Sequence, residues 1–181
     1  MILKEGTFKM SEQKTTRRLA AAGHLTAVIF IATAYIHIPT GLGYTHAGDG
    51  FIFLAAALLP KPYAIAAASI GASMADFASG MAIWAPATVI LKALTVLPFT
   101  SKKGSVLVRR NFLALIPALI INIFGYSIYE DLFMTPTSLS AALASAFMQT
   151  PFYAIQTLIG AAIFITLGKA ADAKRFGAAF R

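Results

Sequence analysis

Six apolar stretches, separated by short polar segments, run along the chain. They predict helices over residues 16–36, 48–59, 63–79, 84–99, 111–129 and 138–169. A helix needs about 20 mostly apolar residues to cross a bilayer, and the stretch 48–59 is short for that purpose. We therefore expect an all-α integral membrane protein, a six-transmembrane-helix bundle over residues 16–170, with an N-terminal tail at residues 1–15 and a basic tail at residues 171–181.

Prolines and glycines interrupt the apolar pattern between the first two predicted helices. Pro39, Gly41 and Gly43 are residues that break a helix, so the segment 38–47 is expected to be a loop. If the chain starts in the cytoplasm, one crossing places this loop on the opposite side of the membrane.

All basic residues except Lys92, which lies inside an apolar stretch, form one patch around the start of the first predicted helix and one after every second helix. These patches are Lys4, Lys9, Lys14, Arg17 and Arg18; Lys61; Lys102, Lys103, Arg109 and Arg110; and Lys169, Lys174, Arg175 and Arg181. Because Lys and Arg near membrane helices are retained on the cytoplasmic side, the pattern predicts cytoplasmic N- and C-termini and an even number of crossings.

Composition agrees with a membrane protein. The chain is 58% hydrophobic and 12% charged, whereas about a quarter of the residues in a soluble domain are charged. The net charge of +8 could suggest nucleic-acid binding. However, the basic residues are spread over every expected cytoplasmic segment and form no stripe interleaved with aromatics. We expect a multi-pass protein of the cell membrane, specifically the bacterial plasma membrane. We expect no nucleic-acid partner.

The residue types needed for several kinds of chemistry are missing. There is no cysteine, which excludes disulfides, thiolate metal sites and a cysteine nucleophile. No phosphate-binding Walker motif, nucleophile elbow or His-Glu-x-x-His motif occurs. His37 and His46 share no helical spacing with a carboxylate. We therefore expect no catalytic residue, no metal and no cofactor, and a binding function rather than an enzyme.

Polar side chains inside the apolar stretches are the candidate binding residues, because each costs about 2.5–3.5 kcal/mol at mid-membrane if it is charged. The candidates are Asp49, Asp76, Trp84, Thr88, Lys92, Asn122, Tyr126, Gln149 and Tyr153. Within the fourth stretch, Trp84, Thr88 and Lys92 are spaced four apart and share one helical face. All the candidates fall in the outer half of the bundle, which suits a small, flat, polar heterocycle.

Each candidate also has a structural interpretation. Asp49 can complement the dipole at a helix N-terminus, and Asn122 and Gln149 can form interhelical hydrogen bonds. Asp76 is the expected counter-ion of Lys92 when no ligand is bound, since an unpaired ammonium would be costly there.

Three short motifs carry a resemblance to a known family. They are Gly48-Asp49; Ala75-Asp76 with Gly80; and Trp84-Ala85-Pro86-Ala87-Thr88 with Lys92. With these motifs the chain resembles the substrate-binding S-components of energy-coupling factor (ECF) vitamin transporters, in the subgroup named after riboflavin transporters.

The resemblance implies partners and two further functional surfaces. The partners would be a transmembrane coupling subunit, two cytoplasmic ATPase subunits and a vitamin-like ligand. Ala20, Gly23 and Ala27 are small residues that permit close helix contact, and they would dock the coupling subunit. The segment from Pro39 to Ala47, with Gly41, Gly43 and Tyr44, would be a gating loop.

The expected function is the substrate-capturing subunit of an ATP-driven importer for a vitamin or precursor. Riboflavin, pyridoxine and the hydroxymethylpyrimidine precursor of thiamine are the candidate substrates, and Asp and Lys inside the bundle favour a small pyridine or pyrimidine. Two alternatives stay open: a membrane enzyme or assembly factor that uses Asp49 and Asp76, and a stand-alone facilitator.

Overall fold

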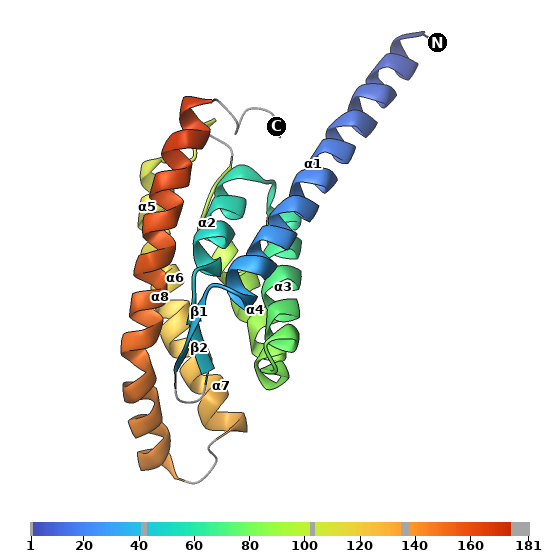
Figure 1. The fold of residues 1–181 in the computed structure, drawn as a ribbon. Coiled ribbons are helices and arrows are strands. Elements are labelled where there is room, and N and C mark those ends of the chain that lie inside the picture. The colour runs from blue at the N-terminus through green and yellow to red at the C-terminus, as the bar shows by residue number, and fades with distance from the viewer. Residues whose placement is uncertain (1, 41–42, 102–103, 135–137, 175–181) are drawn as a thin grey trace.

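The chain folds into a bundle of six helical segments with one small β-hairpin (Figure 1). The computed structural model describes residues 2–40, 43–101, 104–134 and 138–174. The first four helices are α1 (Ile2–Ala34), α2 (Gly48–Leu58), α3 (Lys61–Ala78) and α4 (Ala85–Val96), the last preceded by the short helix η1 (Ala82–Trp84). The fifth segment consists of α5 (Arg109–Leu113), α6 (Leu115–Ile120), the π-helical turn η2 (Ile121–Gly125) and α7 (Tyr126–Phe133), and the sixth is α8 (Leu139–Ala173).

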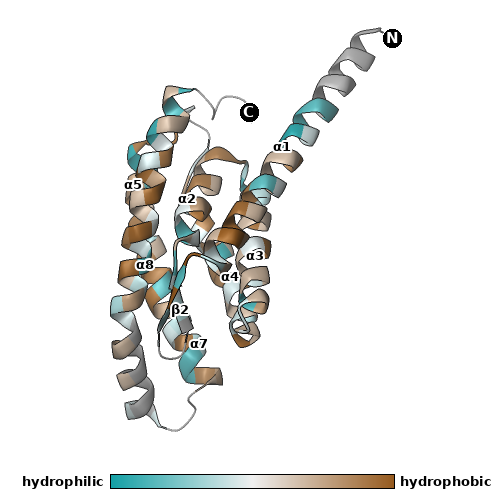
Figure 2. Cartoon of the chain, in the orientation of Figure 1, coloured by the Kyte–Doolittle hydropathy of each residue, from teal (hydrophilic) through white to brown (hydrophobic). Residues whose placement is uncertain are grey.

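The mostly helical architecture and the number of helices confirm the prediction from the apolar pattern. Two segments, Arg109–Phe133 and Thr150–Ala173, are long and apolar enough to cross a membrane, and Gly48–Leu58 and Ala82–Val96 are apolar but shorter. In Figure 2, brown marks apolar residues over much of the bundle, and teal marks hydrophilic residues on the coloured part of α1 that extends beyond the other helices.

Helix α1 is longer than the sequence pattern predicted. It begins at Ile2 rather than near residue 16, and its N-terminal half extends beyond the other helices (Figure 1). The segment before residue 16 contains no proline and several good helix formers. Its helix therefore continues without a break into the apolar part of α1.

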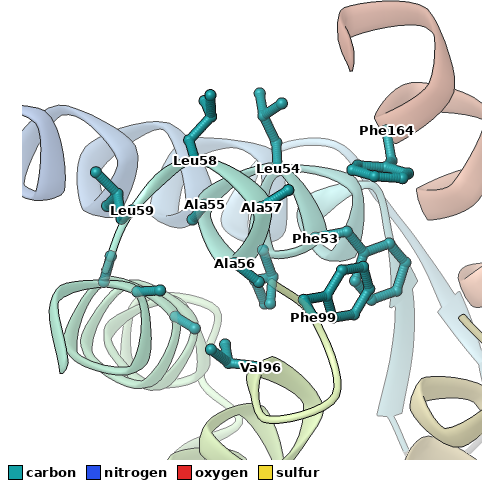
Figure 3. Packing of buried hydrophobic residues seen from close by; sticks show 14 of the residues in the cluster. Phe53, Leu54, Ala55, Ala56, Ala57, Leu58, Leu59, Val96, Phe99 and Phe164 are labelled. Carbon is teal, nitrogen blue, oxygen red and sulfur yellow. The ribbon is translucent and has the colours of Figure 1, made fainter. Parts of the chain in front are cut away.

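Helix α2 is the centre of the bundle. All of its residues except Phe51 are buried, as expected of a helix that is apolar on most of its surface. Its short length is thus explained by burial inside the bundle rather than by contact with lipid along a full crossing. In the core next to α2, the rings of Phe53, Phe99 and Phe164 have centroids 5.4–6.4 Å apart (Figure 3).

Glycines allow α2 and α3 to approach their neighbours closely. A Cβ atom at Gly160 of α8 would lie 3.0 Å from Phe53 Cε2 and 3.1 Å from the backbone nitrogen of Gly50. A Cβ atom at Gly71 of α3 would lie 2.7 Å from the carbonyl oxygen of Thr26 in α1. Larger residues at either glycine would push these helices apart.

The segment 38–47 is not the irregular loop that was predicted, because most of it forms an antiparallel hairpin. Strand β1 (His37–Thr40) pairs with β2 (Gly43–His46), with His37 opposite His46 and Pro39 opposite Tyr44. Backbone groups that leave a helix inside a membrane protein need other hydrogen-bond partners, and strand pairing supplies them here. Gly41 lies outside the described residues.

The start of α1 and the end of α8 lie at the same end of the bundle, whereas α7 lies toward the other end (Figure 1). At the end that holds the start of α1, side chains fix the segment between α4 and α5. Lys61 Nζ donates to the carbonyl oxygens of Val96 and Phe99 at 2.8 and 2.7 Å, and Asp172 accepts from the backbone nitrogen of Val106 at 2.6 Å.

Candidate functional site

A small cavity lies between the β-hairpin and helices α3, α4, α7 and α8. Its volume is about 40 Å³, which is room for a few waters and far below the several hundred Å³ typical of ligand pockets. It is lined by Thr40, Tyr44, Thr45, His46, Asp76, Trp84, Thr88, Tyr126, Phe152, Tyr153 and Gln156. The predicted binding residues thus meet at one place, although they come from five separate elements: Asp76 from α3, Trp84 from η1, Thr88 from α4, Tyr126 from α7 and Tyr153 from α8.

Aromatic side chains form one wall of the cavity. The ring centroids of Trp84 and Tyr126 are 5.8 Å apart, and Tyr126 stacks on Tyr153 with centroids 5.5 Å apart and an interplanar angle of 13°. The hydroxyl groups of Thr88 and Tyr126 are hydrogen-bonded at 3.1 Å. This wall offers flat apolar faces beside hydroxyl groups, a surface suited to an aromatic heterocycle.

The hairpin covers the cavity and is fastened to helices on two sides. The Tyr44 hydroxyl donates to Asp76 Oδ1 of α3 at 2.5 Å, and the backbone nitrogen of His46 donates to Gln156 Oε1 of α8 at 3.3 Å. The Thr45 hydroxyl donates to the carbonyl oxygen of Phe152 at 3.4 Å. These contacts connect the hairpin to α3 and α8.

Burial affects both titratable residues of the hairpin that line the cavity. Burial raises the pKa of Tyr44, and the negative charge of Asp76 raises this pKa further. Burial lowers the pKa of His46 to about 4, so that its imidazole is neutral at pH 7. Consistent with a neutral ring, His46 Nδ1 accepts a hydrogen bond from the backbone nitrogen of Gly48 at 3.2 Å.

Asp76 is only partly satisfied by these contacts. It is 5% exposed and lines the cavity, and Oδ1 accepts from Tyr44. Among the described residues, no group makes a hydrogen bond to its second carboxylate oxygen, Oδ2. The Thr88 hydroxyl also interacts with this carboxylate, and it is hydrogen-bonded to the Tyr126 hydroxyl, in a contact where either oxygen can be the donor.

A buried ion pair lies next to the cavity without lining it. Lys92 Nζ is 2.6 Å from Asp49 Oδ1, and both side chains are 0% exposed. Asn122 Nδ2 and Gln156 Nε2 donate to Asp49 Oδ2 at 2.8 and 3.0 Å, and Lys92 also donates to Asn122 Oδ1 at 3.2 Å. The prediction that Asp76 is the counter-ion of Lys92 was therefore wrong, because α2 inserts Asp49 between α4 and α8.

Local helix geometry explains how these polar groups reach one another. Asn122 lies in the π-helical turn η2, a type of helix irregularity that is frequent at functional sites. Gln156 is one turn before Gly160, where α8 lies so close to α2 that an added Cβ would contact Gly50. Gln156 links the two parts of the site, since its amide contacts both Asp49 and the hairpin.

The residues predicted to dock the coupling subunit lie away from the cavity. Ala20, Gly23 and Ala27 are exposed on α1, and no atom lies within 4 Å of where a Cβ of Gly23 would be. The opposite face of α1, which includes Ala22 and Ile29, packs into the core. The side chain of Gln149 lies outside the part of the chain that the structure describes.

Within the described residues, no group of three or more histidines and carboxylates could hold a metal ion.

The sequence analysis did not identify four of the cavity residues, Thr40, Thr45, His46 and Phe152. Thr40, Thr45 and His46 lie in short strands that give no periodic pattern, and Phe152 is an apolar residue of the long apolar helix α8 that nothing in the sequence distinguishes from its neighbours.

Comparisons with known proteins point to one family. A family model described as "ECF-type riboflavin transporter, S component" matches residues 13–173. A solved structure, described as "Structure and mechanism of the S component of a bacterial ECF transporter", matches with a TM-score of 0.67 and 20% identity. The match covers 86% of this chain and 95% of that chain, and at this identity it shows a common fold. A search of curated proteins found no match.

Proposed function

Because the chain belongs to the family of ECF-type riboflavin transporter S components, we propose that it captures riboflavin in the cavity beneath the β-hairpin. S-components of this family are membrane-embedded, substrate-binding subunits of vitamin importers and work with a membrane coupling subunit and ATPases. The resemblance inferred from the motifs at Asp49, Asp76 and Trp84 is thereby confirmed.

One observation carries the location of the site. Aromatic and polar side chains from α3, α4, α7, α8 and the hairpin meet around one buried cavity. Trp84, Tyr126 and Tyr153 supply stacking faces, and Asp76 and Thr88 supply polar groups at the same place. Such a combination of apolar faces and few polar groups is typical of small-molecule sites. The role of Asp49, Lys92 and Asn122 is to support this wall through their buried network, with Gln156 as the connection.

The size of the cavity supports a gating role for the hairpin. A vitamin cannot enter about 40 Å³, so binding requires the hairpin to move away from α3 and α8. The Tyr44–Asp76 and His46–Gln156 hydrogen bonds are the contacts that opening would break. Pro39, Gly41, Gly43 and Tyr44 belong to this proposed gate.

The exposed small residues of α1 suit contact with the coupling subunit. Ala20, Gly23 and Ala27 are exposed along one stretch of α1, and Gly23 leaves open space above the helix. In a membrane, small residues let a second helix approach closely. With the six-helix bundle embedded in the bilayer and both termini in the cytoplasm, the hairpin that covers the cavity faces the outer side, and this arrangement agrees with the basic patches.

Uptake measurements test this function. Cells that produce the chain with its coupling subunit and ATPases should accumulate labelled riboflavin, and cells with an ATPase inactivated in its ATP-binding motif should not. Unlabelled pyridoxine and hydroxymethylpyrimidine serve as competitors. If either one inhibits the uptake of labelled riboflavin more strongly than unlabelled riboflavin does, that compound is the preferred substrate. Uptake that needs no ATPase would instead establish a facilitator, and chemical conversion of the substrate would establish an enzyme.

A further inference from the structure

We propose that Asp76 Oδ2 is the acceptor for an N–H group on the edge of the bound heterocycle, an inference that rests on the proposed function. For riboflavin this group is the imide N–H, the one N–H of its ring system. The site would then select rings that carry a hydrogen-bond donor on the edge, and it would reject the same rings after N-methylation.

The hydrogen bonds of Asp76 are the first support. The carboxylate is buried in the cavity wall, and Tyr44 satisfies Oδ1 at 2.5 Å. Within the described parts of the chain, Oδ2 has no hydrogen-bond partner. A buried carboxylate oxygen without a donor is costly, and a ligand donor in the cavity would remove that cost.

The charges nearby are the second support. Lys92 is the buried cation whose charge acts on Asp76. Its ammonium, however, is paired with Asp49 at 2.6 Å. It also donates to Asn122 at 3.2 Å. Because these contacts occupy Lys92, the carboxylate of Asp76 keeps its capacity to accept a hydrogen bond from a ligand.

The third support is that Gln156, the other side chain of the cavity wall with an amide oxygen that could accept from the ligand, already has both ends of its amide hydrogen-bonded. A carboxylate only accepts, so the Gln156 group that contacts Asp49 Oδ2 at 3.0 Å must be the amide nitrogen. Its oxygen then accepts from the backbone nitrogen of His46. Both ends of Gln156 are thus occupied while the hairpin is closed, whereas Asp76 Oδ2 is not.

The arrangement also gives the ligand an orientation. Helices α3 and α8 lie on different sides of the hairpin (Figure 1). A ring that rests on Trp84 and Tyr126 would direct its N–H edge toward Asp76 on α3. Tyr44 would close over this edge, because its hydroxyl already reaches the other oxygen of the same carboxylate.

The test compares riboflavin with 3-methylriboflavin, whose imide nitrogen carries a methyl group in place of hydrogen. Both are titrated by calorimetry into the purified full chain, its Asp76→Ala and Asp76→Asn variants, and Glu12→Gln as a matched control on the exposed part of α1. The wild type should bind 3-methylriboflavin at least about tenfold more weakly than riboflavin, as expected for the loss of a charged hydrogen bond.

Asp76→Asn, which keeps the volume of the side chain, separates this hydrogen bond from steric exclusion of the methyl group, and Asp76→Ala removes the acceptor altogether. Asp76→Ala should bind the two compounds with nearly equal affinity, since the acceptor is absent, and Glu12→Gln should discriminate like the wild type. If Asp76→Ala fails to fold, Asp76→Asn decides the question, because its neutral amide should reduce the discrimination severalfold.

Two results would overturn the assignment. Equal binding of both compounds to the wild type shows that no imide hydrogen bond is made, and undiminished discrimination in the Asp76 variants shows that another group accepts it. Either result leaves riboflavin capture intact, whereas absence of riboflavin binding to the wild type overturns the proposed substrate together with this inference.

Discussion

Lys92 Nζ and Asp49 Oδ1 lie 2.6 Å apart in an ion pair that is fully buried between α4 and α2. Asn122 and Gln156 donate to the second oxygen of Asp49, so the carboxylate has partners from three other helical segments. This network holds α2, α4, η2 and α8 together beside the cavity and leaves Asp76 available at the cavity wall.

The first prediction concerns the ion pair. Lys92→Met should destabilise the folded protein by about 3–5 kcal/mol, because it leaves the Asp49 carboxylate buried without its cation. The double variant Lys92→Met/Asp49→Leu should recover much of this loss, since no charge is left uncompensated. Thermal unfolding in detergent measures both, with Lys14→Met on the exposed surface of α1 as the control. A Lys92→Met protein with wild-type stability would show that the pair contributes nothing to folding.

The second prediction concerns the aromatic wall. Trp84→Ala should weaken riboflavin binding by about 2 kcal/mol, or roughly thirtyfold in Kd, through lost stacking and burial. Calorimetric titration measures this change. Phe124→Ala is the matched control, because Phe124 is an exposed aromatic residue of η2 that does not line the cavity. Equal affinities for Trp84→Ala and wild type would place the ligand elsewhere.

The third prediction concerns the exposed face of α1. Ala20→Leu, Gly23→Leu or Ala27→Leu should abolish uptake and leave riboflavin affinity unchanged, because added volume prevents close approach of the coupling subunit. Uptake and calorimetry are measured in parallel on the same variants. Ala162→Leu, at an exposed position of α8, should change neither quantity. Loss of binding together with uptake would indicate that the α1 face supports the fold instead.

The fourth prediction concerns pH. His46 has a pKa of about 4 in the closed hairpin because burial opposes its charged form, and about 6.5 when it is exposed. Between these values the exposed form binds the proton and the closed form does not. The stability of the closed hairpin should therefore decrease as pH falls from about 6.5 toward 4.

Riboflavin affinity between pH 7.5 and 5 measures this effect, since a ligand beneath the hairpin requires closure. His46→Asn removes the titrating group, and its affinity should depend less on pH. The charged groups around His46 include Asp49 and Lys92, with His37 on the paired strand. An identical pH dependence in both proteins would assign it to one of these groups rather than to His46.

The sequence was sufficient for the features that depend on local patterns. Apolar runs identified six helices, and spacing of four residues correctly grouped Trp84, Thr88 and Lys92 as buried residues of one segment. The same runs do not show where a helix continues past its apolar part into polar residues, which is why the start of α1 was misplaced.

Features that depend on neighbours distant in sequence were not predictable in the same way. Helical periodicity identifies Lys92 as inward-facing but does not say which helix it meets, and so the pairing with Asp49 was missed. The strands β1 and β2 have four residues each and contain Pro39 and Gly43. Such short strands carry no clear alternation, and the contacts of the hairpin with Asp76 and Gln156 fix it in place.

The most direct test of riboflavin capture uses Trp84, the single tryptophan of the chain, which lies in the cavity wall. Riboflavin is added to the purified protein, and the tryptophan fluorescence is followed at increasing ligand concentration. We expect quenching that saturates at one riboflavin per chain. Fluorescence that shows no saturable change up to millimolar riboflavin would contradict it.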